Sequence, residues 1–107
     1  MVIMLRDDQV IEVFDSADTP PSWIEGVDVA NGEYEFCDDQ GQRYVGVVTQ
    51  GSTWRKQPEF VLRPEGMPEL KNALDLINRA QDIESNDRFR DLQSLREHLT
   101  SARSEPR

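Results

Sequence analysis

The chain has 107 residues, a length that suits one domain with a single hydrophobic core. Hydrophobic residues make up 36% and charged residues 31%, so we expect a small core and a well-solvated surface. Twelve Lys and Arg against 21 Asp and Glu give a formal net charge of −9. That charge excludes the classes of protein that bind nucleic acid phosphates or anionic membranes through a basic surface, and it favours a basic partner.

The sequence contains no segment that predicts secretion or membrane insertion. The longest apolar run, residues 1–5, is shorter than the roughly 20 residues of a membrane span or the roughly 7 of a signal-peptide core. We therefore expect a cytoplasmic protein. Cys37 is the single cysteine, so no disulfide within the chain is expected. With one Cys and one His, zinc ribbons and thiolate centres are excluded. We predict neither a metal site nor a cofactor.

The N-terminal residues predict a β-hairpin. Residues 1–6 and 9–14 are β-rich in composition, and Asp7-Asp8 between them predicts a two-residue turn. This register places Leu5 opposite Val10 and distributes apolar side chains over both faces. We expect the hairpin to be covered on both sides.

A three-strand meander is predicted next. Asn31-Gly32 predicts a tight turn between strands at residues 26–30 and 33–38. A second turn, with Gly41 in the left-handed conformation, leads to a strand over residues 43–49. One face of this meander is apolar and is formed by Val27, Val29, Tyr34, Phe36 and Tyr44.

The second half predicts one short strand and then helices. Residues 60–62 lie between Pro58 and Pro64, which indicates a short edge strand. Apolar residues then recur at helical spacing in two sets, first Leu70, Leu74 and Ile77 after Pro68, and then Phe89, Leu92, Leu95 and Leu99 after a cap at residues 85–87. The pattern fits two amphipathic helices or one helix broken near Glu84.

Together these elements predict an α+β domain over residues 1–100. An antiparallel sheet of five or six strands occupies residues 1–63, two C-terminal amphipathic helices occupy residues 67–100, and residues 101–107 form a frayed tail. We expect the first helix to cover the apolar face of the meander. The second would then retain surplus apolar surface.

The candidate partner-binding residues are Asp28, Glu33 and Glu35. In the predicted register Asp28 lies directly opposite Glu35, and like charges across a strand pair are destabilising. One interpretation is a solvated sheet face, where screening keeps this repulsion small. The functional interpretation is an acidic patch that binds a basic protein. A calcium loop is disfavoured, because Ala30 and Gly32 occupy positions where an EF-hand places ligands.

Two further groups have side chains that could form a site, Cys37 with His98 and the segment Trp54-Arg55-Lys56. Cys37 is predicted to point away from the core, towards Glu33 and Glu35, and acidic neighbours disfavour its thiolate. A dyad with His98 has no local signature, and we expect His98 to have a structural role at the surface. Trp54-Arg55-Lys56 combines an indole with two cations, but we expect Trp54 to anchor a loop on the sheet.

Three functions follow in order of preference. The first is a small acidic, non-catalytic interaction protein of bacterial type that binds a basic protein through Asp28, Glu33 and Glu35. The second is a structural homodimer associating through the C-terminal stripe, which we define as Phe89, Leu92, Leu95 and Leu99. The third is a small enzyme that uses carboxylates near Cys37, although no catalytic motif supports it.

Overall fold

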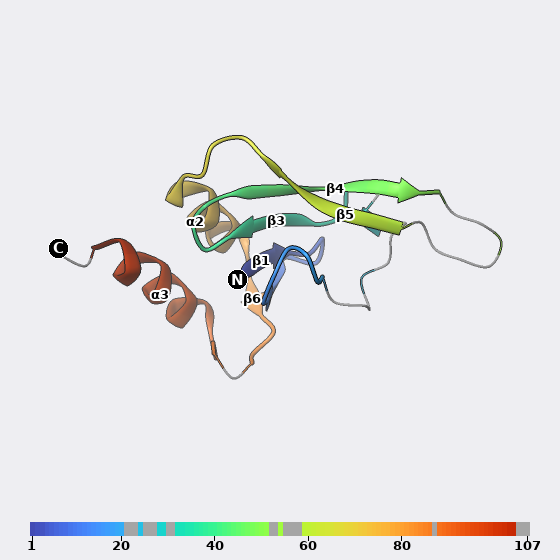
Figure 1. The fold of residues 1–107 in the computed structure, drawn as a ribbon. Helices are drawn as coiled ribbons and strands as arrows, with labels where there is room; N and C mark the ends of the chain where they lie inside the picture. The colour runs from blue at the N-terminus through green and yellow to red at the C-terminus, as the bar shows by residue number, and fades with distance from the viewer. Residues whose placement is uncertain are drawn as a thin grey trace.

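The computed structural model describes residues 1–20, 24, 28–29, 32–51, 54, 59–86 and 88–104. It contains a six-stranded sheet with the strand order β5-β4-β3-β1-β2-β6, together with two helices at the C-terminal end (Figure 1). The strands are β1 (Val2–Leu5), β2 (Val10–Phe14), β3 (Glu35–Asp38), β4 (Arg43–Gln50), β5 (Glu59–Glu65) and β6 (Asp82–Ile83), and the helices are α2 (Leu70–Arg79) and α3 (Leu92–Ser104). The predicted α+β class is confirmed.

The N-terminal hairpin forms, but its turn is one residue longer than predicted. Leu5 pairs with Ile11 rather than with Val10. The Arg6 amide donates to the carbonyl oxygen of Val10 at 3.0 Å, and Gln9 has a φ of 66°. This geometry belongs to a three-residue loop whose last residue is left-handed. The predicted register is therefore wrong by one residue.

The predicted hairpin around Asn31-Gly32 does not form. Residues 28–29 lie in a helical turn, and residues 26, 27, 30 and 31 lie outside the described residues. β3 pairs instead with β1, where Glu35 lies opposite Leu5. Long-range pairing with the buried N-terminal strand has replaced the local turn, because β1 offers β3 a partner that is covered on both faces.

The turn from β3 to β4 forms as predicted. Gly41 has a φ of 82°, and its amide donates to the Asp38 carbonyl oxygen at 3.0 Å. Phe36 pairs with Tyr44, the register expected from the sequence. The loop also contacts α2, since the Gly41 carbonyl oxygen accepts hydrogen bonds from the Glu69 amide at 3.1 Å and from Asn72 Nδ2 at 3.0 Å. A turn made of local residues thus positions the start of a distant helix.

β5 is an edge strand, as predicted, but it is longer than residues 60–62. It pairs antiparallel with β4, and Pro64 lies within it opposite Tyr44. A proline is tolerated here because β5 is at the edge of the sheet, where one side of the strand needs no hydrogen-bond donors. Trp54, which lies between β4 and β5 in the chain, is 86% exposed, so the expectation that it packs on the sheet is wrong.

Two separate helices form, and β6 lies between them. β6 pairs parallel with β2, an element that sequence reasoning missed because two residues carry no detectable periodicity. α3 begins later than the predicted cap, and its N-terminus is capped by Asp91, whose Oδ1 accepts from the Ser94 amide at 2.8 Å. Asn86, in the predicted cap, instead holds the turn before Phe89 by accepting its amide hydrogen at 3.0 Å.

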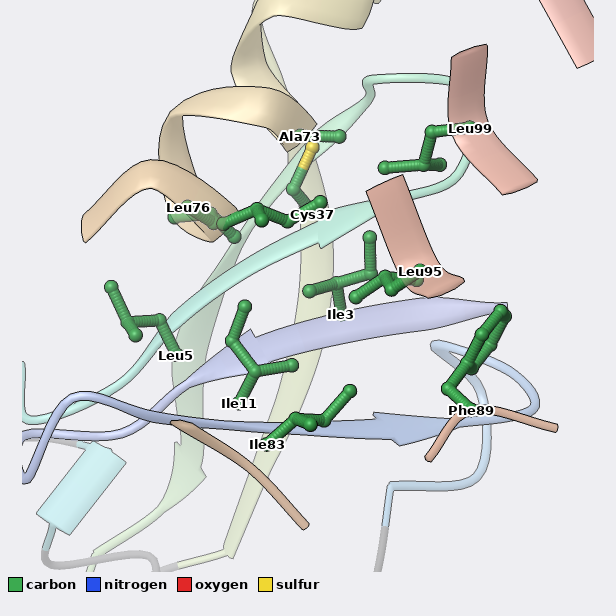
Figure 2. Packing of buried hydrophobic residues seen from close by; sticks show 11 residues of the cluster. Ile3, Leu5, Ile11, Cys37, Ala73, Leu76, Ile83, Phe89, Leu95 and Leu99 are labelled. Carbon is green, nitrogen blue, oxygen red and sulfur yellow. The ribbon is translucent and has the colours of Figure 1, made fainter. Parts of the chain in front are cut away.

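The sheet is buried on both faces near β1, as the sequence predicted. On one face, α2 and α3 cover a helix-side core that includes Ile3, Leu5, Ile11, Cys37, Ala73, Leu76, Ile77, Ile83, Phe89, Leu95 and Leu99 (Figure 2). The other face carries a smaller loop-side core of Val2, Met4, Ile24, Val29 and Phe36.

The helices cover the opposite face from the one expected. From the predicted apolar face of the meander, Val29 and Phe36 lie in the loop-side core with Ile24, and Tyr34 and Tyr44 pack against this core, so α2 does not cover them. In the part of the chain that the structure describes, no helix is long and apolar enough to cross a membrane. Residues 101–104 continue α3, so the predicted frayed tail is wrong for these four residues, and residues 105–107 lie outside the described residues.

Candidate functional site

The three predicted partner-binding residues lie close together, but not as a strand pair. Asp28 belongs to the helical turn, and its carbonyl oxygen accepts the amide hydrogen of Glu33 at 3.1 Å. Its Oδ2 also accepts a hydrogen bond from the Tyr34 hydroxyl at 3.4 Å. Glu35 begins β3 and pairs with Leu5. The predicted repulsive pair of Asp28 and Glu35 across a hairpin is therefore wrong.

Glu35 is neutralised within the chain. Both of its carboxylate oxygens accept hydrogen bonds from Arg79 at the end of α2, one of them at 2.9 Å. Arg79 also lies 2.8 Å from Asp75, one helical turn earlier. The hydrogen bonds that Arg79 donates to Glu35 raise the pKa of Arg79 above its ordinary value, although burial opposes this rise. Sequence reasoning missed this arginine, because residues 35 and 79 meet only through tertiary packing.

Arg6 forms the second charged cluster, at the end of β1. It contacts three carboxylates, with distances of 2.7 Å to Asp8, 2.8 Å to Glu12 and 3.2 Å to Glu84. The hydrogen bond from Arg6 lowers the pKa of Asp8 below its ordinary value. The three carboxylates come from the first turn, β2 and the residue after β6, so this one guanidinium joins three segments. One positive charge among three negative charges leaves a local surplus of negative charge.

A hollow of about 520 Å³ lies between these two clusters. Its lining includes Arg6 and Arg79 and three acidic residues, Asp7, Glu33 and Glu35. We call the acidic surface around this hollow the acidic end. It comprises the carboxylates that line the hollow, the carboxylates that pair with Arg6 or Arg79, and the neighbouring Asp28. These residues are Asp7, Asp8, Glu12, Asp28, Glu33, Glu35, Asp75 and Glu84. Eight carboxylates and two guanidinium groups give it a formal net charge of −6, most of the charge of the whole chain.

The C-terminal stripe is not a free surface. Phe89, Leu95 and Leu99 are buried in the helix-side core, and Leu92 packs against it (Figure 2). The expected surplus of apolar surface on the second helix is therefore absent from this stripe. Association of two copies stays a prediction, and these four residues already have partners within the chain.

Cys37 lies in the helix-side core, which corrects the expectation that it points away from it. Its side chain is 1% exposed and packs beneath α2, near Ala73 and Leu76 (Figure 2). Burial, followed by the charge of Asp38, raises the pKa of the thiol from 9.0 to about 12, while Arg43 opposes the rise. A neutral buried thiol is a poor nucleophile.

The Cys37 thiol is expected to be unreactive in the native protein at pH 8. Because its pKa is raised on folding, the stabilisation from the neutral thiol is complete below about pH 9 and is lost as the pH rises towards 12. Labelling with an aromatic disulfide reagent is expected to be at least about a hundredfold slower in buffer than in denaturant. Equal rates in the two solvents would contradict the burial. The Cys37→Ala variant has no thiol and gives the background rate of the labelling reaction.

His98 does not combine with Cys37. Its ring is exposed on α3 and packs edge-on against Phe89, with 5.5 Å between the ring centroids. No hydrogen bond joins Cys37 to His98 among the described residues. This contact makes His98 part of the packing around the stripe.

The described residues include no group of three or more His, Cys, Asp or Glu side chains arranged to hold a metal ion. The chemical feature of this site is a hollow that is surrounded by more carboxylates than arginines. Comparison with protein-family models, with curated proteins and with solved structures found no match to this chain.

Proposed function

We propose that this chain is a non-catalytic interaction domain that binds a basic segment of a partner protein at its acidic end. The observation that carries the proposal is the surplus of carboxylates around a hollow whose own two arginines are already paired. Arg6 and Arg79 hold the walls in place, and the remaining negative charge favours incoming lysine or arginine side chains.

The shape of the acidic end supports a peptide rather than a metal ion as the ligand. The hollow is about 520 Å³ in volume, which suits one or two long side chains. Its carboxylates come from the first turn, the segment before β3 and the first residue of β3, and among the described residues no three acidic side chains are arranged to hold a metal ion. A basic segment can place several cations along such a surface, whereas one ion cannot reach them all.

The test uses a fluorescein-labelled octalysine peptide and measures its dissociation constant by anisotropy at low and high salt. The double variant Asp7→Lys, Glu33→Lys is expected to weaken binding at least about tenfold. Its control, Asp18→Lys, Glu59→Lys, makes the same change in net charge at exposed positions outside the acidic end. An equal loss in both variants would show that net charge alone attracts the peptide and would overturn the proposal.

A third variant, Arg79→Met, is expected to strengthen peptide binding instead of weakening it. Arg79 is partly exposed and neutralises Glu35 and Asp75, so its removal frees two carboxylates for the peptide. Octalysine is then expected to bind several-fold more tightly. Unchanged or weaker binding, with an unchanged circular dichroism spectrum, would contradict a site at this hollow.

A further inference from the structure

The outer edge of β5 pairs with no other strand among the described residues. β5 is the last strand in the order of the sheet, and its inner side pairs with β4 (Figure 1). Its exposed side chains carry both signs of charge, because Glu59 and Arg63 lie on the same face as Val61. Further along this face, Glu65 lies opposite Arg43. The order of the side chains, rather than their net charge, therefore defines what can pair with this edge.

The hydrogen bonds around β4 indicate which backbone groups of β5 face outward. The amide of Asp38 donates to the carbonyl oxygen of Gln42, the residue before β4, at 2.9 Å, so that carbonyl points towards β3. Backbone groups alternate in direction along a strand, so those of Arg43 are directed to the other side, towards Glu65 on β5. The odd-numbered residues of β5 therefore direct their backbone groups to β4, and the even-numbered residues direct theirs to the open edge.

The even-numbered residues from 60 onward are Phe60, Leu62 and Pro64. Phe60 and Leu62 each present one backbone donor and one acceptor at the edge, whereas Pro64 has no amide hydrogen. The place of Pro64 supports this assignment, since a proline within a strand is tolerated where its nitrogen faces away from the neighbouring strand. An added strand can therefore form hydrogen bonds at residues 60 and 62, and this pairing ends at residue 64.

The edge is complementary to itself in one antiparallel register. With Val61 on a two-fold axis, Val61 lies opposite Val61 of a second copy, and Phe60 lies opposite Leu62. Glu59 then lies opposite Arg63 of the second copy, and the symmetry repeats this pair, so two pairs of opposite charge form. The outward donors and acceptors of residues 60 and 62 also meet each other. Side chains and backbone are thus both complementary.

The neighbouring registers lose this complementarity. With Leu62 on the axis, Glu59 lies opposite Glu65, and like charges across a strand pair are destabilising. With Phe60 on the axis, Glu59 lies opposite Val61 instead of an arginine. Each alternative loses both pairs of opposite charge, so the charges select the register that is centred on Val61.

We propose that this chain forms a two-fold dimer in which the β5 strands of two copies pair antiparallel around Val61. The contact is only a few residues long and smaller than the about 800 Å² that each partner of a standard interface buries, so the association is weak and depends on concentration. The interface is distinct from the C-terminal stripe and from the acidic end, none of whose residues lies on β4 or β5. The pairing does not rest on the proposed function, but with it the dimer has two sites for basic segments.

The first test reverses the charges at the edge and measures the dimer dissociation constant by analytical ultracentrifugation. Glu59→Arg and Arg63→Glu each place like charges opposite one another twice in the dimer, so each is expected to weaken association at least about tenfold. The double variant and an equimolar mixture of the two single variants both restore opposite charges. We expect both to associate as tightly as the wild type. The two side chains are exposed, and a matching circular dichroism spectrum will show that the variants fold.

The second test measures the register directly. Val61 and its counterpart form a non-hydrogen-bonded pair, in which the Cα atoms lie about 4.5 Å apart, within the range that a disulfide spans. Val61→Cys in a Cys37→Ala background is therefore expected to form a disulfide between two copies under mild oxidation. Val47→Cys in the same background is the control, because Val47 is equally exposed but lies on β4, one strand away from the interface.

Four results would overturn the proposal. The first is a wild-type protein that remains monomeric at near-millimolar concentration. The second is association of the single charge variants that is as tight as that of the wild type, and the third is a failure of the double variant and the mixture to recover it. The fourth is equal cross-linking of Val61→Cys and Val47→Cys, which would show contact by collision rather than by a defined register.

Discussion

Replacing Gly41 with alanine is expected to destabilise the fold by about 3 kcal/mol or more. Gly41 has a φ of +82°, and a Cβ built there would lie 2.0 Å from the carbonyl oxygen of Glu69. That oxygen belongs to the backbone just before α2, so it cannot move away as a flexible side chain would. The β3–β4 turn would have to separate from the start of α2, with loss of the bond from Asn72.

Gly66→Ala separates the two causes of this effect. Gly66 has a similar φ of +76°, but nothing lies within 4 Å of its Cβ position. Gly66→Ala is therefore expected to lower the free energy of unfolding by about 1 kcal/mol, the cost of placing an alanine in the left-handed region. Urea unfolding followed by circular dichroism measures both free energies of unfolding. If the two variants are equally destabilised, the close approach of the turn to α2 contributes nothing to stability.

Leu95→Ala is expected to lower the free energy of unfolding by about 3 kcal/mol. Leu95 is fully buried in the helix-side core, where it packs towards Ile3 (Figure 2). The truncation leaves a cavity between α3 and the sheet, which neighbouring side chains fill only in part. Leu92→Ala, at a partly buried position of the same helix, is expected to cost less.

Leu95 also distinguishes the two roles considered for the C-terminal stripe. A core residue alters stability at every protein concentration, whereas an interface residue alters the oligomeric state. Urea unfolding at two concentrations, with light scattering of the native protein, gives both measurements. A wild-type dimer that Leu95→Ala dissociates without loss of stability would restore the predicted interface.

Local patterns were sufficient for much of the fold. The left-handed turn at Gly41, the pairing of Phe36 with Tyr44 and the edge position of β5 all follow from a few neighbouring residues. The helical spacing of apolar residues identified α2 and most of α3. Turn chemistry and periodicity act within about ten residues, so the sequence shows them directly.

The candidate site was predicted only in part. Asp28, Glu33 and Glu35 do lie near one another, but the arginines that organise the acidic end were not foreseen. Arg79 is 44 positions from Glu35, and Glu84 is 78 positions from Arg6. No local signal links residues so far apart.

The sequence by itself determined the acidic character of the chain, its turns and the positions of its helices, because these depend on composition and on short-range geometry. Only the tertiary structure decided that β3 pairs with β1, that the helices bury Cys37, and that β6 joins the sheet. The physical reason is competition for burial. β1 is apolar on both faces, so it is most stable in the centre of the sheet, where both faces are covered. β3 therefore pairs with β1, and the local hairpin at Asn31-Gly32 does not form.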